Sequence, residues 1–310
     1  MKKIAFVFPG QGAQYVGMGK ELVEKFKVAN DVFEKASHSL GYDMKKLCFE
    51  GPEEELKKTE NTQPAILTVS IAAFEVLKEH GLKPEIAAGL SLGEFSALVA
   101  SGVMSFEDAV KVVKVRGKYM QEEVPLGVGT MAAFIGLDRE KVIEACERAS
   151  EFGIVEPANF NSPAQIVISG EVKAVEKAVE IGTELGAKRA MVLNVSAPFH
   201  SSMLKGAGEK LGIELDKIPL SDFSYPVVAN VTAKYYDSNS SVKELLVRQV
   251  SSSVLWEDSV RTMVEDGVDT FVEVGPGRAL SCFIKKISRE VKLLNVGDID
   301  SLEKTLKALK

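Results

Sequence analysis

The chain has 310 residues, of which 45% are hydrophobic and 26% are charged, and its formal net charge is −6 at pH 7. This length can bury a large core in one or two domains, and the composition is that of a globular protein. The negative charge and the absence of a Lys/Arg cluster argue against nucleic-acid binding, and no apolar run is long enough to cross a membrane.

The N-terminal residues predict a strand from Ile4 to Phe8, and no signal peptide precedes it. The three cysteines, Cys48, Cys146 and Cys282, are far apart and form no Cys-x-x-Cys pair. We therefore expect a cytoplasmic protein with reduced thiols and no metal site built on cysteine pairs.

A glycine-rich loop, Pro9–Gln14, follows the first strand. It lacks the third glycine of a dinucleotide fingerprint, where Tyr15 stands, and no Gly-Lys-Ser/Thr follows at P-loop spacing. The loop instead predicts free backbone amides at a strand end, which suit an oxyanion. Helices are predicted next over Gly19–Leu40 and Ala65–His80.

The most informative segment is Gly89-Leu90-Ser91-Leu92-Gly93, which lies between an apolar run and a helix-forming run. Strand, Gly-x-Ser-x-Gly and helix in this order are typical of a nucleophile elbow. The two glycines would remove side chains where strand and helix cross. The sequence therefore predicts Ser91 as a nucleophile, with the Leu92 amide directed at an oxyanion. The alternative is a tight turn with an incidental serine.

A catalytic serine needs a base, and the chain has three histidines. His38 and His80 lie near the ends of predicted helices, where a histidine has an ordinary structural explanation. His200 lies in a loop that leaves an apolar strand, a usual position for catalytic groups. By elimination, His200 is the predicted base for Ser91.

The helix predicted from Ser105 to Glu123 has an arginine on its apolar face. The face comprises Ala109, Val112, Val113, Arg116 and Met120. A buried arginine requires an anion, and two interpretations are open. Arg116 forms a structural salt bridge with a buried carboxylate, or its planar guanidinium binds a substrate carboxylate.

Residues 127–195 predict a separate unit with the order β-α-β-β-α-β, which is ferredoxin-like. Its predicted elements are strand Thr130–Ile135, helix Asp138–Ala149, strands Gly153–Asn159 and Gln165–Ser169, helix Val172–Leu185 and strand Arg189–Val195. Residues 1–126 and 196–310 are predicted to form a larger α/β-hydrolase-like domain with a parallel sheet. The groove between the two units is the expected substrate site.

The last third of the chain predicts a strand over Val227–Val231, a helix over Val242–Val250 and a strand over Thr270–Val274. The Gly-Pro-Gly that follows the last strand predicts a turn that opens another helix. Gln249 lies on the apolar face of its helix, and the local pattern gives it no functional role.

Taken together, seven short stretches resemble the malonyl-CoA:acyl carrier protein transacylases, in family order from about residue 4 to residue 280. They are Val7–Gly12, Gly89–Phe95, Arg116-Gly117, Asn159–Pro163, Pro198–Ser201, Arg248-Gln249 and Glu273–Gly277. One departure is Leu90, where many members have a histidine before the serine. Leu90 leaves the nucleophile assignment intact.

The resemblance implies an acyltransferase that moves malonyl from malonyl-CoA to acyl carrier protein through a seryl ester, without metal or bound cofactor. Ser91 would be acylated, His200 would act as base, and Arg116 would bind the malonyl carboxylate. The backbone amides of Gln11 and Leu92 would form the oxyanion hole.

Further roles are implied for three residues. Gln249 would lie beside His200, where a nearby backbone carbonyl orients the imidazole. Phe199 and Asn159 are assigned to substrate binding. Scattered cations are candidates for contact with an acidic carrier: Lys188, Arg189, Lys205, Lys285 and Lys286.

Three alternatives to this function remain. A serine esterase or thioesterase would use the same elbow but give the acyl group to water. A silent docking module would keep the fold without the reaction. A loader for a polyketide pathway would use the same chemistry with another carrier.

Overall fold

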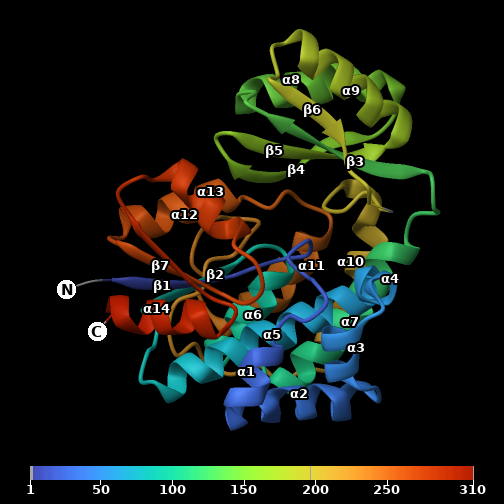
Figure 1. The fold of residues 1–310 in the computed structure, drawn as a ribbon. Coiled ribbons are helices and arrows are strands. Elements are labelled where there is room, and N and C mark those ends of the chain that lie inside the picture. The colour runs from blue at the N-terminus through green and yellow to red at the C-terminus, as the bar shows by residue number, and fades with distance from the viewer. Residues whose placement is uncertain (1–2, 196, 310) are drawn as a thin grey trace.

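The computed structural model describes residues 3–195 and 197–309, and it contains two separate sheets (Figure 1). The parallel sheet consists of β1 (Ile4–Phe8), β2 (Ile86–Gly89), β7 (Thr270–Val274) and β8 (Lys292–Val296). Its strand order is β2-β1-β7-β8. The antiparallel sheet consists of β3 (Gly129–Ile135), β4 (Val155–Ser162), β5 (Gln165–Glu171) and β6 (Arg189–Val192), in the order β4-β5-β3-β6. The expected mixed α/β fold with a parallel sheet is confirmed.

Helices cover both faces of the parallel sheet. On one side lie α1 (Lys20–Lys25), α2 (Lys27–Leu40), α3 (Met44–Glu50), α4 (Glu53–Lys57), α5 (Thr59–Glu79), α6 (Leu92–Ala100) and α7 (Phe106–Glu122), with α10 (Lys205–Leu215) and α11 (Val242–Val250) beside them. The other side packs on α12 (Trp256–Glu265) and α13 (Ala279–Ile287). Strand β1 is buried on both faces: Phe6 belongs to the first core and Val7 to the second. This two-sided burial explains why its sequence is a continuous apolar run.

The antiparallel sheet has a core of its own. Helices α8 (Arg139–Ala149) and α9 (Val172–Glu184) cover the face of this sheet that points away from the rest of the chain (Figure 1). Phe134, Ile168 and Val175 are among the buried side chains between sheet and helices. The observed order β3-α8-β4-β5-α9-β6 agrees with the predicted β-α-β-β-α-β order.

Two predicted elements differ in number or kind from the observed ones. The helix predicted over Gly19–Leu40 is two helices, because Phe26 between them has an extended backbone (φ −122°, ψ 123°). The predicted strand Val227–Val231 forms only isolated bridges, since the chain turns back at Asn230 and Ala233 donates to the Ala229 carbonyl at 2.9 Å. This turn brings Asn230 to the active-site elbow.

Boundaries also move within the antiparallel sheet. Strand β4 runs on to Ser162, beyond the predicted end at Asn159, because Phe160 and Ser162 pair with β5. Strand β6 ends at Val192, three residues before the predicted end. The residues that follow β6, Leu193–Val195, line the space between the two sheets, and the Leu193 amide still donates to the Met131 carbonyl of β3 at 2.8 Å.

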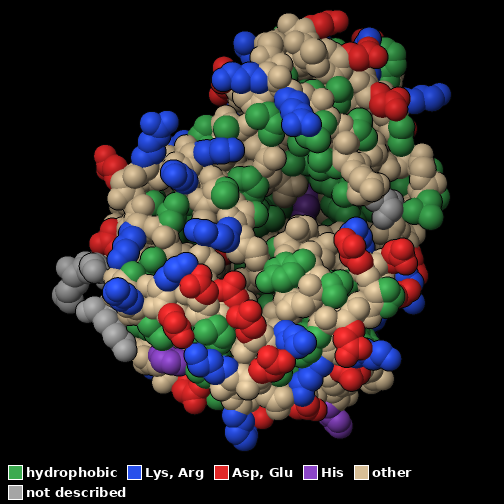
Figure 2. All heavy atoms as spheres, in the orientation of Figure 1, with side chains coloured by type: hydrophobic (Ala, Val, Ile, Leu, Met, Phe, Trp, Pro, Cys, Tyr) green, Lys and Arg blue, Asp and Glu red, His purple; other side chains and the backbone are tan. Residues whose placement is uncertain are grey.

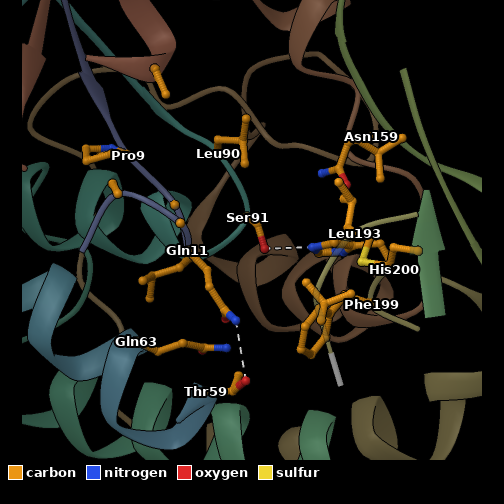
Figure 3. Close-up of a pocket in the computed structure, with 18 of the residues that line it drawn as sticks. Pro9, Gln11, Thr59, Gln63, Leu90, Ser91, Asn159, Leu193, Phe199 and His200 are labelled. Atoms are coloured by element: carbon orange, nitrogen blue, oxygen red, sulfur yellow. Dashed lines mark hydrogen bonds between the residues drawn. The ribbon is translucent and has the colours of Figure 1, made fainter. Parts of the chain in front are cut away.

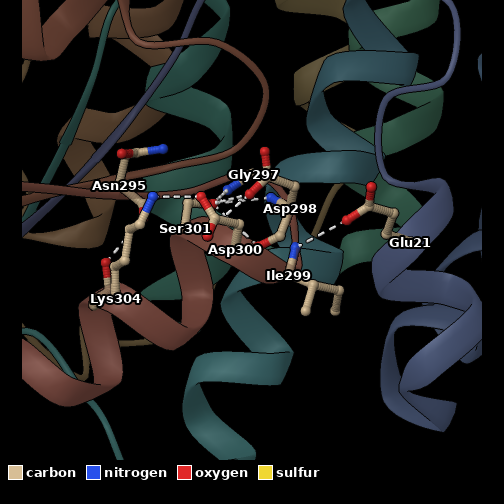
Figure 4. Close-up of polar contacts among 9 residues, drawn as sticks. Glu21, Asn295, Gly297, Asp298, Ile299, Asp300, Ser301 and Lys304 are labelled. Carbon is tan, nitrogen blue, oxygen red and sulfur yellow. Dashed lines mark hydrogen bonds and ion pairs between the residues drawn. The ribbon is translucent and has the colours of Figure 1, made fainter.

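The C-terminal helix α14 (Ile299–Leu309) is fixed at its first turn (Figure 4). Asp298 Oδ1 accepts from the Ser301 amide at 2.8 Å, and Ser301 Oγ accepts from the Asp298 amide at 3.1 Å. This reciprocal capping satisfies amides that begin a helix. Glu21 on α1 accepts from the Ile299 amide at 3.3 Å, which ties both ends of the chain together. In the described part of the chain, no helix combines the length and apolarity that a bilayer span requires.

Candidate active site

The nucleophile elbow has the geometry that its glycines suggested. Ser91 joins β2 to α6 with φ 54° and ψ −105°, a left-handed conformation that is strained for a serine. A Cβ on Gly89 would lie 1.9 Å from the Gly93 carbonyl carbon, and one on Gly93 would lie 2.0 Å from the Phe8 carbonyl oxygen. Strand and helix therefore cross too closely for any side chain at these two positions.

Asn230 holds the elbow in place, a role that the sequence did not reveal. The Ser91 amide donates to Asn230 Oδ1 at 2.6 Å, and Asn230 Nδ2 donates to the Gly89 carbonyl at 2.7 Å. The side chain is fully buried. A polar residue inside the apolar run Val227–Val231 was the available signal, since a buried amide needs partners.

The structure brings Ser91 and His200 together, although they are 109 residues apart (Figure 3). Ser91 Oγ lies 2.7 Å from His200 Nε2, and His200 Nδ1 lies 2.8 Å from the Gln249 backbone carbonyl. A carbonyl only accepts, so the proton is on Nδ1 and Nε2 accepts from the serine. The pKa of His200 is lowered to about 4, mainly by burial and to a lesser extent by the charge of Arg116. Nε2 is therefore unprotonated at neutral pH and can take a proton.

The other two histidines lie outside this site. His80 follows the last turn of α5, where its Nδ1 lies 2.8 Å from the Val76 carbonyl. His38 is exposed on α2. Both positions agree with the structural explanation expected from the sequence.

Arg116 is 1% exposed on α7 and reaches the nucleophile. Its Nη2 donates to Ser91 Oγ at 3.1 Å and to Gln249 Oε1 at 2.8 Å, while Nη1 donates to Gln63 Oε1 at 2.8 Å. Nε has no hydrogen-bond partner among the residues that the structure describes. Among the described residues no carboxylate lies within ion-pair distance, so the structure does not contain the direct salt bridge considered above. Burial lowers the pKa of Arg116 to about 10, which leaves the group charged at pH 7.

Gln249 on α11 connects the base, the cation and the elbow. Besides its contacts with His200 and Arg116, its Nε2 donates to the Ser91 carbonyl at 3.0 Å and to Glu94 Oε2 at 2.6 Å. Glu94 also accepts from the Asn230 amide at 3.2 Å and from the Tyr236 hydroxyl. Burial raises the pKa of the Glu94 carboxyl to about 7, against the effect of these donors. The sequence analysis gave Glu94 and Tyr236 no role.

Gln11 and Leu92, the two residues predicted for the oxyanion hole, line the cavity described below. Leu92 is the first residue of α6, and Gln11 lies in the loop after β1. Within the residues that the structure describes, neither amide donates to another protein group. A helix N-terminus carries unpaired N–H groups and a partial positive charge, so the Leu92 amide suits an oxyanion. The Gln11 side chain turns toward Thr59 Oγ1, at 3.4 Å (Figure 3).

The site opens into a cavity of about 790 Å³ between the two sheets. Figure 2 shows the hollow where the two parts of the molecule meet. The large part contributes Ser91, Arg116, His200 and Phe199 to its lining, and the antiparallel sheet contributes Asn159. Further lining residues of the smaller part are Met131, Asn161 and Val167. All the residues predicted for the site therefore line this one cavity, except Gln249, which is buried behind the lining residues.

No group of three or more His, Cys, Asp or Glu residues in the described chain is arranged to hold a metal ion. The polar groups around Ser91 are a base, a cation, amides and the buried Glu94. They can activate a hydroxyl and hold an oxyanion, which are the requirements of acyl transfer, and the cation can in addition bind a carboxylate.

Known proteins that are similar to this chain in sequence and in structure belong to one family. Residues 5–299 match the acyl transferase domain. The malonyl CoA-acyl carrier protein transacylase of Bacillus subtilis is 47% identical, over 100% of this chain and 98% of the relative. The structure of the transacylase of that name from Clostridium perfringens is 53% identical, with a TM-score of 0.96 over 99% of this chain and 97% of that one. A structure described as a type II PKS acyl-carrier protein in complex with its malonyl-transacylase is 44% identical, with a TM-score of 0.97 over 99% and 100%.

Proposed function

We propose that this chain, which belongs to the malonyl CoA-acyl carrier protein transacylases of the acyl transferase family, forms a malonyl ester on Ser91 and passes it to a carrier thiol. The chain is an acyltransferase. The observation that carries the proposal is the position of Ser91 Oγ, 2.7 Å from His200 Nε2 and 3.1 Å from Arg116 Nη2 in one cavity. The printed names of the relatives support malonyl-CoA as donor and acyl carrier protein as acceptor.

In the first half-reaction, Ser91 Oγ attacks the thioester carbonyl of malonyl-CoA while His200 Nε2 takes the hydroxyl proton. The carbonyl oxygen becomes an oxyanion, which the Gln11 and Leu92 amides bind. When the C–S bond breaks, the imidazolium returns its proton to the departing sulfur. The products are free coenzyme A and malonyl-Ser91.

In the second half-reaction, the phosphopantetheine thiol of the carrier gives its proton to His200 and attacks the seryl ester. The same two amides bind the second oxyanion. The C–O bond then breaks, and His200 returns the proton to Ser91. The malonyl thioester of the carrier leaves, and the enzyme regains its starting form.

Arg116 gives the reaction its acyl preference in this proposal. The malonyl group carries a free carboxylate, and Arg116 lines the cavity without an ion-pair partner among the described residues. A buried donor gains from an anionic acceptor, and a guanidinium can bind both carboxylate oxygens. Phe199 and Asn159, which border the same cavity, enclose the acyl group.

The carrier approaches over α13. Ala279, Leu280 and Phe283 of this helix line the cavity. Arg278, Lys285, Lys286 and Arg289 are exposed on or beside it, and none has an ion-pair partner among the described residues. Lys and Arg side chains gather over α12 and α13 beside the hollow in Figure 2. Of the cations predicted for this contact, we retain Lys285 and Lys286.

The proposed function also includes a pathway, a cellular compartment and a domain arrangement. The reaction supplies fatty acid synthesis in the cytoplasm, where the free thiols of Cys48 and Cys146 stay reduced. Residues 1–126 and 196–310 form a hydrolase-like catalytic domain. Residues 127–195 form a ferredoxin-like insertion that closes one side of the cavity.

Intact-protein mass spectrometry after incubation with malonyl-CoA tests the mechanism. We expect one malonyl adduct on the wild type and none on Ser91→Ala; an adduct that persists in the variant would refute the assignment. Addition of carrier protein with its phosphopantetheine arm should then move the label to the carrier. Release of free malonate at the same rate would instead indicate a thioesterase.

A further inference from the structure

A buried carboxylate lies beneath the elbow and has no role in the reaction as written. Glu94 is 1% exposed on α6, three residues after the nucleophile. Its acceptors are engaged by Gln249 Nε2 at 2.6 Å, by the Asn230 amide at 3.2 Å and by the Tyr236 hydroxyl. Burial of a carboxylate costs free energy, so packing alone does not explain why Glu94 lies at this position.

The carboxylate fixes which way the Gln249 amide faces. In its ionised form, which predominates above a pH of about 7, Glu94 accepts hydrogen bonds only, so the NH2 end of the Gln249 amide points to it. The carbonyl end then points to Arg116, where Oε1 accepts from Nη2 at 2.8 Å. If Glu94 were an amide, Gln249 could turn over and place its NH2 group against the guanidinium. Two sets of donors would then face each other.

The amide also separates two opposite charges. Arg116 is buried without a direct ion pair, and Glu94 lies on the other side of the Gln249 amide. A carboxylate in direct contact would occupy the guanidinium, as a bidentate pair does. With the amide between them, the charge of Arg116 is compensated while no carboxylate of the described chain contacts the guanidinium, which lines the cavity.

We propose that Glu94 is a positioning residue for carboxylate recognition: through the Gln249 amide it holds the Arg116 guanidinium open to the acyl pocket. Glu94 thereby sets the preference for acyl groups that carry a carboxylate, such as malonyl, over neutral ones, such as acetyl. This inference rests on the proposed function and adds a residue to it.

The test compares the loading of Ser91 by malonyl-CoA and by acetyl-CoA in four proteins: wild type, Glu94→Gln, Arg116→Ala and the double variant. Glu94→Gln keeps the size of the side chain. We expect it to lower the malonyl-to-acetyl ratio of kcat/KM by about tenfold or more, the effect of losing one charge-assisted hydrogen bond. Because Glu94 acts through Arg116, it should lower the ratio little further when Arg116 is already alanine.

Glu273→Gln is the matched control. Glu273 is another fully buried carboxylate, which caps α13 by accepting from the Leu280 and Ser281 amides at 3.1 and 2.8 Å. It has no contact with Arg116 or Gln249 among the described residues. Removal of its charge should affect malonyl and acetyl loading equally. If Glu94→Gln does not fold, Glu94→Asp keeps the charge but withdraws it from Gln249, and we expect a smaller fall in the same ratio.

Equal losses for the two acyl groups, an unchanged ratio in a folded variant, or additive effects in the double variant would each overturn the inference. The proposed function has a separate criterion. The proposed function fails if the wild type does not prefer malonyl over acetyl, or if Arg116→Ala leaves that preference unchanged. If that preference is present and Glu94→Gln leaves it intact, only the role of Glu94 is lost.

Discussion

Gln249 contributes two different groups to the active site. Its backbone carbonyl accepts from His200 Nδ1, which fixes the tautomer of the base, and its side-chain amide contacts Arg116 and the Ser91 carbonyl. Orientation of the base and position of the cation therefore depend on one residue at the end of α11. A backbone carbonyl carries no charge, so His200 stays poised as a neutral base without a carboxylate partner.

The first prediction concerns the charge state of His200. With a pKa of about 4, below the usual 6.5, its ring should stay neutral with the proton on Nδ1 as the pH falls through 6. The unfolded chain takes up this proton first, so the neutral ring contributes stability above pH 6.5 that is lost as the pH falls toward 4. Nitrogen-15 NMR of the histidine rings measures both tautomer and titration. A His200 ring that titrates near 6.5 would contradict this environment.

The second prediction concerns the guanidinium. Arg116→Ala should reduce malonyl loading far more than acetyl loading, since a charge-assisted pair with a carboxylate contributes about 1.5–3 kcal/mol. Arg116→Lys keeps the charge but loses the planar fork, so its rate of malonyl loading should lie between those of the wild type and Arg116→Ala. Single-turnover loading with both thioesters measures the difference. Equal losses for the two acyl groups would remove Arg116 from carboxylate binding.

Among the secondary-structure elements, those defined by short-range patterns could be predicted from the sequence. Strands β1 and β7 and helix α11 begin and end where their apolar runs and flanking residues place them. The elbow was predictable because its glycines, serine and flanks are local. Asn230 and Tyr236 were not, because they meet Glu94 across 136 and 142 residues of chain. Which distant polar group will satisfy a buried one depends on the tertiary fold, and local periodicity carries no such information.

The third prediction tests the close crossing of strand and helix at the elbow. In Gly93→Ala, the new Cβ would lie 2.0 Å from the Phe8 carbonyl oxygen, a backbone atom that cannot move alone. We expect a loss of about 3 kcal/mol in the free energy of unfolding, together with loss of Ser91 labelling. Gly212→Ala in α10 is the control: its Cβ would meet only a Val247 methyl at 3.2 Å. It should change stability by about 1 kcal/mol or less. Urea unfolding of both variants measures these changes. Equal stabilities of the two variants would contradict the close crossing of strand and helix at Gly93.

At the scale of the whole molecule, the parallel and the antiparallel sheet enclose one cavity. The parallel sheet presents the nucleophile at the carboxyl end of β2, where open α/β sheets usually bind ligands. The antiparallel sheet packs its helices on the far side and gives its other face to the cavity. The cavity thus has one wall that carries Ser91 and a second wall from the antiparallel sheet. Its opening beside α13 lies among cations, although the chain as a whole is negative.

The last prediction follows from this uneven distribution of charge. Carrier proteins are typically acidic, so approach over α13 should be favoured by Lys285 and Lys286 and weakened by salt. Replacing both lysines by glutamate should raise the KM for the carrier and flatten its dependence on ionic strength, while Ser91 loading from a small malonyl thioester without carrier or nucleotide, such as the N-acetylcysteamine ester, stays unchanged. The double variant Lys304→Glu and Lys307→Glu on α14, the helix near the chain termini in Figure 1, is the control with the same change of charge away from the cavity. Because steering acts on encounter rather than on chemistry, the difference between variant and control should disappear at high salt. Carrier kinetics that are unaffected at low salt would place the docking surface elsewhere.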